Sequence, residues 1–333
     1  MILVRTPLRI SLFGGGSDLP SYYSENLGAV LSTTIDQYMY IALCKTSYKG
    51  VKVVYDQIEM SRTVDGIMHS RVREGLKRFG VHSNIEISSF AEIPTKGTGL
   101  GSSSTFTVGL VNGLAHLTDT SLSTHDIAEM ACDIEINRCH EPIGKQDQYA
   151  AAFGGLNIIH FDAKGVSIVK PAFTGRTVDA LDDNLLMFYT GITRNTSEIL
   201  KPISENRSKK HTARMDKMVE QVSTAFSYLN VGDTDSVGSM LHDAWMLKRE
   251  MGAGVTNDTI DAYYNTAIKN GALGGKLLGA GGGGFLLFYV PQSDQERVRQ
   301  AMAKEWDLKE FKFNFENTGT TIVYDEGSKY ISR

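Results

Sequence analysis

Cysteine is scarce in this 333-residue sequence, which contains only Cys44, Cys132 and Cys139 and no Cys-x-x-Cys pair. Three cysteines without that spacing argue against a disulfide framework and against a cysteine-rich zinc site. The N-terminal residues Met1-Ile-Leu-Val-Arg5 also lack the apolar core of a secretion signal. We therefore predict reduced thiols and a cytoplasmic protein.

Long apolar runs and an excess of positive charge are missing as well. No apolar stretch approaches the roughly 18 residues that cross a membrane, and the formal net charge is −4. A surplus of acidic residues does not favour nucleic acid or an anionic membrane as a partner. We expect neither partner, and we predict a monomer or homodimer that acts on small molecules.

The composition is otherwise that of a globular protein with room for two domains. Hydrophobic residues make up 41% and charged residues 22% of the chain, which is ordinary for such proteins, and 333 residues exceed a typical single core. The composition changes near residues 171–184, which we interpret as a linker. We predict domains at 1–178 and 179–333 and an α+β fold, because the second half mixes helices with a small sheet.

Glycine, by contrast, is plentiful, and the most informative stretch is Lys96-Gly-Thr-Gly-Leu-Gly-Ser-Ser-Ser-Thr105. It lies between a predicted strand at 83–88 and a predicted buried helix at 101–117. The glycines allow backbone N–H groups to come close to a ligand, and the start of a helix adds unpaired N–H groups and a positive dipole end. The stretch predicts an anion cradle for a nucleotide phosphate, although a Gly/Ser-rich turn with a serine cap fits too. It is not a Walker A loop, since no Lys-Ser or Lys-Thr follows the last glycine.

Another glycine run, Gly279-Ala-Gly-Gly-Gly-Gly284, which is the third along the chain, matches the Gly-x-Gly-x-x-Gly spacing of dinucleotide-binding proteins. That motif follows a strand and opens a helix, whereas residues 285–290 predict a strand after the run. A dehydrogenase is therefore disfavoured. Two interpretations stay open: a backbone that passes close to a ligand, or a tight bend in the second domain.

Four polar residues could together serve phosphoryl transfer: Arg9, Ser103, Glu135 and Asp147. Such a reaction needs a phosphate cradle, a divalent cation held by an acid and a hydroxyl, a base, and a cation on the transferring group. Each residue also has an ordinary structural explanation. Arg9 fits a charge at a strand edge, Ser103 and Asp147 fit helix caps, and Glu135, on an apolar helix face, fits the partner of a core arginine.

Three motifs resemble those of the GHMP family of small-molecule kinases and occur in the family's order: Pro7–Gly14, Pro94–Ser104 and Lys276–Gly284. The resemblance spans essentially the whole chain. It implies a two-domain fold, with an N-terminal domain like ribosomal protein S5 domain 2 and a ferredoxin-like C-terminal domain. It also implies ATP as the phosphate donor and Mg²⁺ as the cofactor.

The resemblance further assigns roles to residues. It implies that Ser103 and Glu135 hold Mg²⁺, that Arg9 stabilises charge on the transferring group, and that Asp147 is the catalytic base, twelve residues after Glu135 as in galactokinase-like members. The residues implied to bind ATP are Lys96, Gly97, Thr98, Gly99, Leu100, Gly101, Ser102, Ser103 and Ser104.

The first glycine loop, Gly14-Gly-Gly-Ser-Asp-Leu-Pro20, is similar to the pattern of D-glycero-D-manno-heptose 7-phosphate kinases. Galactokinase-like members have Gly-Glu-His-x-x-Asp there. The similarity implies phosphorylation of the anomeric 1-hydroxyl to the 1,7-bisphosphate, on the way to a nucleotide-activated (GDP-) heptose. Fucose, galactose or N-acetylhexosamine 1-kinases, and a non-catalytic sugar sensor of the same fold, are the alternatives.

Several residues are candidates for contact with the sugar phosphate. The candidate cations for the distal phosphate are Lys145, Arg194, Lys201 and the cluster at 207–211. Arg194 is the best placed of them, because it lies just past a predicted strand, where binding residues often stand. The substrate-binding residues that we predict are Gly15, Gly16, Ser17, Asp18, Arg194, Gly281 and Gly282.

Overall fold

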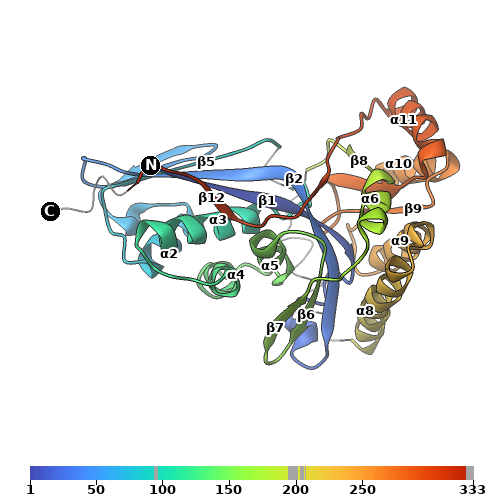
Figure 1. Cartoon of the computed structure of the whole chain (residues 1–333), viewed down its shortest axis with the longest axis horizontal. Coiled ribbons are helices and arrows are strands. Elements are labelled where there is room, and N and C mark those ends of the chain that lie inside the picture. Colours follow the sequence, from blue (N-terminus) through green and yellow to red (C-terminus); the bar gives the residue numbers. More distant parts are fainter. Residues whose placement is uncertain (94–96, 194–201, 203–205, 207, 328–333) are drawn as a thin grey trace.

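The computed structural model describes residues 1–93, 97–193, 202, 206 and 208–327, and it contains two β-sheets (Figure 1). In the larger sheet the strands run in the order β12-β1-β2-β5-β3-β4, with β11 and β6 also paired to β2, and β7 paired to β6. These strands are β1 (Ile2–Phe13), β2 (Gly28–Lys45), β3 (Val51–Val54), β4 (Ile58–Ser61), β5 (Ile85–Ala91), β6 (Asn157–Asp162), β7 (Gly165–Val169), β11 (Phe315–Glu316) and β12 (Thr321–Asp325). The smaller sheet has the order β8-β10-β9 and consists of β8 (Leu185–Tyr189), β10 (Phe285–Tyr289) and β9 (Gly274–Leu277).

Helices cover both sheets, with α2 to α5 beside the larger sheet and α8 to α11 around the smaller one (Figure 1). Their bounds are α1 (Pro20–Tyr23), η1 (Val64–Gly66), α2 (Ser70–Arg78), α3 (Ser102–Leu117), α4 (Thr124–Cys132), η2 (Asp133–Arg138), α5 (Gln146–Phe153), α6 (Gly175–Asp183), α8 (Lys209–Asn230), α9 (Thr234–Arg249), α10 (Asp258–Lys269) and α11 (Gln292–Trp306). Among the helices that the structure describes, none combines the length and apolarity needed to cross a membrane.

The two long strands β1 and β2 differ from what the sequence suggested. From its sequence, Pro7 predicts a break between two short strands, and residues 29–45 predict a strand pair. Instead β1 continues through Pro7, with an irregularity of register between Pro7 and Leu8. Proline cannot donate to a strand ladder and is tolerated at such irregularities. One uninterrupted β2 then pairs along the length of β1.

Helix α3 is the buried helix that the sequence predicted. Most of its residues are apolar or small and are buried, and the helix lies against β1 and β2. Two glycines make this close approach possible. A Cβ on Gly113 would lie 2.4 Å from Leu43 Cδ1, and one on Gly109 would lie 2.7 Å from Thr6 Oγ1. The first residue of α3, Ser102, is thereby held next to the end of β1.

Two segments correct the predicted domain organisation. Residues 175–183, expected to be part of a linker, form helix α6, which is capped by Thr174. The final strands β11 and β12, expected in the second domain, pair with β2 and β1 of the larger sheet. The chain therefore returns to its first sheet at its C-terminal end, and a boundary at 178 does not describe residues 315–325.

A continuous core joins the two sheets. Leu8 and Ile10 of β1 belong to the same buried cluster as Val222 of α8, Leu241 of α9 and Leu287 of β10. Residues from both halves of the sequence thus pack directly against β1. The mixture of helices and largely antiparallel sheets confirms the predicted α+β class, and the core places the end of β1 where the two halves meet.

Candidate active site

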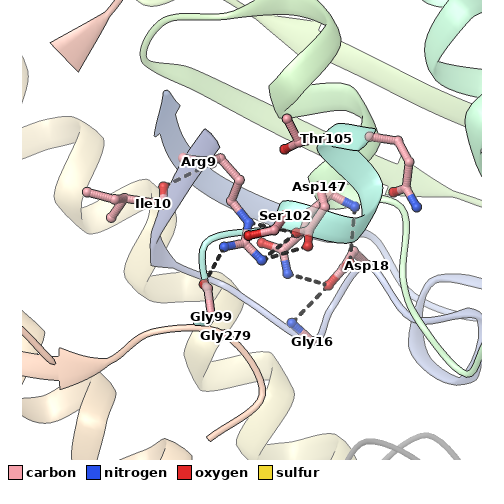
Figure 2. A network of polar contacts seen from close by, with 12 residues as sticks. Arg9, Ile10, Gly16, Asp18, Gly99, Ser102, Thr105, Asp147 and Gly279 are labelled. Atoms are coloured by element: carbon pink, nitrogen blue, oxygen red, sulfur yellow. Dashed lines mark hydrogen bonds and ion pairs between the residues drawn. The ribbon is translucent and has the colours of Figure 1, made fainter. Parts of the chain in front are cut away.

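Arg9 and Asp147 form an ion pair at the junction of the two halves (Figure 2). The Arg9 Nε donates to Asp147 Oδ1 and its Nη2 donates to Oδ2, both at 2.7 Å. The third arm, Nη1, donates to the carbonyl oxygen of Gly99 at 2.6 Å. Arg9 is buried beside β2, and its N–H donates to the Leu100 carbonyl of the glycine loop, so it is not an exposed charge at a sheet edge. Such a two-point contact fixes the orientation of the carboxylate.

The pair lines a cavity of about 180 Å³. A single buried water needs only about 15 Å³, so the cavity has room for a ligand. Asp147 lies in the first turn of α5, whose cap is Lys145, and its carboxylate keeps lone pairs that Arg9 does not use. Asp147 is thus not a helix cap, and its side chain is free to accept a further hydrogen bond from a ligand.

The predicted phosphate loop lines the same cavity. Gly101 precedes α3 with a φ of 76°, and among the described residues no side chain accepts a hydrogen bond from the N–H groups of the first turn. Ser103 is exposed there and is not the cap. The loop residues that line the cavity are Gly97, Thr98, Gly99, Gly101, Ser102, Ser103 and Ser104. Open N–H groups at the start of a 16-residue helix favour an anion.

Of the predicted ATP-binding residues that the structure describes, Leu100 does not line this cavity. Leu100 is fully buried in the core, and its carbonyl oxygen accepts a hydrogen bond from the Arg9 N–H at 3.1 Å. Lys96 lies outside the described residues. The role of Leu100 in the structure is thus to connect the loop to β1.

The third glycine run, residues 279–284, packs directly against the predicted phosphate loop at Gly99 (Figure 2). A Cβ on Gly279 would lie 2.4 Å from Gly99 Cα, and the Phe285 N–H donates to the Thr98 carbonyl at 3.1 Å. Both interpretations of this run therefore apply in part, since Gly279 lines the cavity and also bends against a neighbouring loop.

Gly281 and Gly282, predicted to bind substrate, lie beside Val255 instead. The N–H of Gly282 donates to the Val255 carbonyl at 2.9 Å. Gly279 and Ala280 are the residues of this run that line the cavity.

The first glycine loop contributes Gly15, Gly16 and Asp18 to the cavity. The Asp18 carboxylate accepts hydrogen bonds from the Gly16 N–H at 2.9 Å and from the Gln146 N–H at 3.1 Å. Burial, and then the charge of Asp147, raise the pKa of Asp18. Ser17 does not line the cavity, because its hydroxyl donates to the Ala29 carbonyl at 3.0 Å. Asp18 is therefore held rigidly, with its carboxylate at the cavity wall.

Glu135, the predicted magnesium ligand, is buried in the π-helical turn η2 and does not line the cavity. Its Oε1 accepts from Arg71 Nε at 2.8 Å, and its Oε2 accepts from Gln148 Nε2 at 2.6 Å. The alternative that Glu135 pairs with a core arginine is what the structure shows.

Ser103 and Glu135 as placed therefore do not complete a magnesium site. Arg71 already supplies the positive charge next to Glu135, and a second cation at the same carboxylate would be repelled. Across the residues that the structure describes, no group of three or more His, Cys, Asp or Glu side chains is arranged to hold a metal. Of the predicted pair, the Ser103 hydroxyl is the group that reaches the cavity.

Of the cations expected to hold the distal phosphate, Lys145 is described and lies away from the cavity. Lys145 pairs with Glu129 at 3.2 Å and does not line the cavity. Arg194 and Lys201 lie outside the described residues, as does Arg207 of the 207–211 cluster. Two lysines that the sequence did not single out, Lys248 and Lys276, line the cavity instead. Lys276 opens the third glycine motif, which was a usable signal, whereas Lys248 is one of several basic residues on α9.

Two uncharged polar residues were also missed. The Ser11 hydroxyl and the Gln146 side-chain oxygen are buried at the cavity and have no hydrogen-bond partner among the described residues. Buried polar atoms are nearly always satisfied, so both are available to a ligand. Ser11 was recognisable, because side chains two apart on a strand share a face and Ser11 follows Arg9 by two.

The arrangement can bring a phosphoryl group and a hydroxyl together. The α3 start attracts an anion, Arg9 is a cation beside it, and the Asp147 carboxylate can accept a proton or orient a hydroxyl. Asp18 can accept hydrogen bonds from neighbouring hydroxyls of the same ligand. These groups come from β1, α3, α5 and the loop after β1, and the pair Arg9 and Asp147 connects them.

Comparisons with known proteins match this geometry. The model of the GHMP kinases N terminal domain matches residues 67–155, and that of the GHMP kinases C terminal domain matches residues 225–308. The chain is 30% identical to D-glycero-alpha-D-manno-heptose 7-phosphate kinase of Campylobacter jejuni, over 95% of this chain and 97% of that protein. It is 26% identical to a galactokinase of Pyrococcus furiosus, over 92% and 94% of the two chains.

A solved structure supports the fold independently. The crystal structure of a D-glycero-D-manno-heptose 1-phosphate kinase from Bacteroides thetaiotaomicron superposes with a TM-score of 0.80 at 23% identity, over 98% of this chain and 100% of that one. The predicted two-domain GHMP kinase fold is thereby confirmed. The chain belongs to the GHMP kinase family and is a phosphotransferase of the sugar-kinase type.

Proposed function

We propose that this kinase transfers the γ-phosphoryl group of ATP to the anomeric 1-hydroxyl of D-glycero-D-manno-heptose 7-phosphate. The product is the 1,7-bisphosphate, a precursor of a nucleotide-activated (GDP-) heptose. The observation that carries the proposal is that the Arg9–Asp147 pair, the α3 start and Asp18 line one cavity. The similarity to the Campylobacter jejuni enzyme supports the choice of sugar.

In this proposal each residue has a defined task. Asp147 accepts the proton of the sugar 1-hydroxyl or orients that hydroxyl, and an anomeric hydroxyl is acidic enough for a carboxylate to suffice. Arg9 holds the Asp147 carboxylate in place and adds positive charge where the phosphoryl group passes. The backbone of residues 97–104 binds the nucleotide phosphates, and Asp18 binds sugar hydroxyls.

The first glycine loop supports a sugar longer than a hexose. Gly15 and Gly16 line the cavity where galactokinase-like members have Glu and His. A Cβ on Gly15 would lie 3.2 Å from the Ser11 hydroxyl oxygen, which is tighter than an ordinary contact. Side chains at these positions would therefore occupy space beside Asp18 that a seven-carbon sugar needs.

Mg²⁺ stays part of the proposal as the usual companion of ATP in phosphoryl transfer. The Ser103 hydroxyl would contact it, and Glu135 would take part only after exchanging Arg71 for the metal. A monomeric or homodimeric state, a cytoplasmic location, and the lack of nucleic-acid and membrane partners also stay predictions.

A panel of sugars with ATP tests the proposal. It should include heptose 7-phosphate, heptose 1-phosphate, fucose, galactose and N-acetylhexosamines. Both heptose phosphates belong in it, because phosphorylation of the 1-hydroxyl of one and of the 7-hydroxyl of the other gives the same bisphosphate. We expect kcat/KM to be highest for heptose 7-phosphate. A clear preference for an unphosphorylated hexose would point to another sugar 1-kinase, and no turnover with any sugar would favour a sensor.

A further inference from the structure

Two lysines line the cavity without a carboxylate partner among the described residues. The Lys248 Nζ, on α9, donates to the carbonyl oxygens of Leu277, at 3.0 Å, and Gly279. The Lys276 Nζ, on β9, donates to the Leu12 carbonyl at 2.8 Å. Within the described part of the chain, neither lysine forms an ion pair. Their backbone partners hold them in place but do not neutralise them.

The charges that line the cavity do not balance. Arg9, Lys248 and Lys276 are three cations, and Asp18 and Asp147 are the two acids. Asp147 is occupied by Arg9 through both of its oxygens. Asp18 accepts from backbone N–H groups, and its raised pKa reflects its burial. The described lining of the cavity therefore has one more basic than acidic side chain, and neither lysine has an acid of its own.

The pKa values of both lysines are lowered by their burial and by neighbouring positive charges. Burial, and then the nearby Arg9, lower the pKa of Lys248 to about 7. Burial, then Lys248 and then Arg9, lower the pKa of Lys276 well below its usual value. A buried cation without a counter-charge is unfavourable, and an anion of a bound ligand would supply the missing charge.

The position of Lys248 indicates what that anion is. The Gly279 carbonyl that Lys248 contacts belongs to the loop against Gly99, and the Gly99 carbonyl accepts from Arg9. Lys248 and Arg9 thus approach two adjacent glycine loops, next to the open start of α3. An ammonium has three donors. Two of those of Lys248 are used by carbonyls, and one is left to point at a ligand.

We propose that Lys248, supported by Lys276, binds a phosphate oxygen of a substrate in this cavity. The proposal rests on the proposed function only in that both substrates of that reaction carry phosphate. The source is either the terminal phosphates of the nucleotide or the phosphate of the sugar. The chemistry is the same in both cases, an ammonium against a phosphate oxygen.

Lys248→Met removes the charge and keeps most of the aliphatic stem. The matched control is Lys52→Met, since Lys52 pairs with Glu86 on β5 at 3.1 Å, away from the cavity. Calorimetry would measure the affinity of both variants for a non-hydrolysable ATP analogue and for adenosine, and for heptose 7-phosphate and free heptose. We expect Lys248→Met to bind one phosphate-bearing ligand roughly ten- to a hundredfold more weakly than the control does, with the phosphate-free counterpart unchanged.

The arms of this experiment identify the source. A loss for the ATP analogue assigns Lys248 to the nucleotide phosphates, and a loss for heptose 7-phosphate assigns it to the sugar phosphate. Equal affinities of Lys248→Met and Lys52→Met for both would overturn the proposal. If the wild-type protein does not bind heptose 7-phosphate, the proposed substrate fails. The ATP analogue and the sugar phosphate preferred in the panel then decide the role of Lys248.

Proton uptake is a second measurement, which a purely structural role would not change. The charged groups around Lys248 are Arg9 on β1, Lys276 on β9 and the cavity acids Asp18 and Asp147. At pH 8 a lysine with a pKa near 7 is mostly neutral, and a bound phosphate favours its protonated form. Ligand binding at pH 8 should therefore take up more protons in the wild type than in Lys248→Met. Lys248→Arg, which stays charged, should keep the affinity and lose the extra uptake, and it serves if the methionine variant does not fold.

Discussion

At the scale of single residues, the site depends on which buried charges have partners. Arg9 and Asp147 satisfy each other at the cavity, and Arg71 and Glu135 satisfy each other beside it. The Arg71 guanidinium also contacts Glu141 at 3.2 Å. The same ionic chemistry thus serves the proposed reaction centre in one place and a structural connection between α2 and η2 in the other.

Glu135→Gln tests the structural role. The variant leaves Arg71 without its fully buried counter-charge, so we expect the free energy of unfolding in urea to fall by about 3 kcal/mol. Glu141→Gln is the matched control, because Glu141 contacts the same arginine but is 26% exposed; its loss should be smaller. Equal stabilities of the two variants would contradict this account of Glu135.

The Mg²⁺ requirement of Glu135→Gln addresses the other role of this residue. If Glu135 exchanges Arg71 for the metal, the concentration of Mg²⁺ at half-maximal turnover rises in the variant and not in the Glu141→Gln control. An unchanged requirement would leave Ser103 as the remaining protein group of the predicted pair.

Much of the candidate site could be predicted from single residues, and the residues that could not be predicted were missed for physical reasons. Arg9, Ser103 and Asp147 stand in or beside glycine motifs that a chain needs to approach phosphates, and the structure brings them to one cavity. The partner of Glu135 could not be read from the sequence, because Arg71 lies on another element. Lys248 carried no local signal, since what distinguishes it is the lack of an ion-pair partner among the described residues, which depends on the whole fold.

At the scale of elements, propensity described the helices better than the sheets. The buried helix α3 and the strand β10 after the third glycine run formed as expected. The sequence overestimated the effect of Pro7, which β1 absorbs by an irregularity of register. It also mistook α6 for a linker, because its acidic residues look like a solvated loop until Leu181 is seen to be buried. In both segments, contacts with distant parts of the chain determined the secondary structure.

Gly99→Ala tests the contact between the two glycine loops. A Cβ there would lie 2.4 Å from the Leu278 carbonyl oxygen, and the backbone has a φ of +80°. Gly80→Ala is the matched control, because Gly80 has a φ of +65° and no atom within 4 Å of an added Cβ. We expect about 1 kcal/mol of destabilisation from backbone strain alone in Gly80→Ala and roughly 2–4 kcal/mol in Gly99→Ala.

Activity should separate the same two variants. The Gly99 carbonyl accepts from Arg9, so a displaced loop should lower turnover in Gly99→Ala, whereas Gly80→Ala should retain it. Chemical denaturation and a steady-state assay measure both quantities. Indistinguishable variants would show that the loops tolerate separation.

At the scale of the whole molecule, the C-terminal strands close the structure onto its beginning. Strand β12 pairs with β1, and Thr320 Oγ1 lies 2.9 Å from Thr6 Oγ1. The sequence showed that these residues form strands but not which sheet they join, because pairing between distant segments leaves no local pattern. Residues near both ends of the chain therefore support the strand that carries Arg9.

Truncation tests this closure. A chain that ends at Lys312 lacks β11 and β12, exposes the edge of β1 and loses the side-chain contact to Thr6. We expect its thermal midpoint to fall by about 10 °C or more. A chain that ends at Gly327 keeps both strands and should melt like the full chain. If the shorter chain melts at the same temperature, the C-terminal strands are dispensable.

The central claim is that Asp147, held by Arg9, acts on the hydroxyl that receives the phosphoryl group. Turnover of Asp147→Asn with ATP and the sugar preferred in the panel tests it most directly, with Asp133→Asn as control because Asp133 pairs with Arg138 on the surface. We predict that Asp147→Asn turns over at least about 100-fold more slowly, while it still binds the ATP analogue and Asp133→Asn keeps wild-type activity. Turnover of Asp147→Asn near that of the wild type would contradict the account.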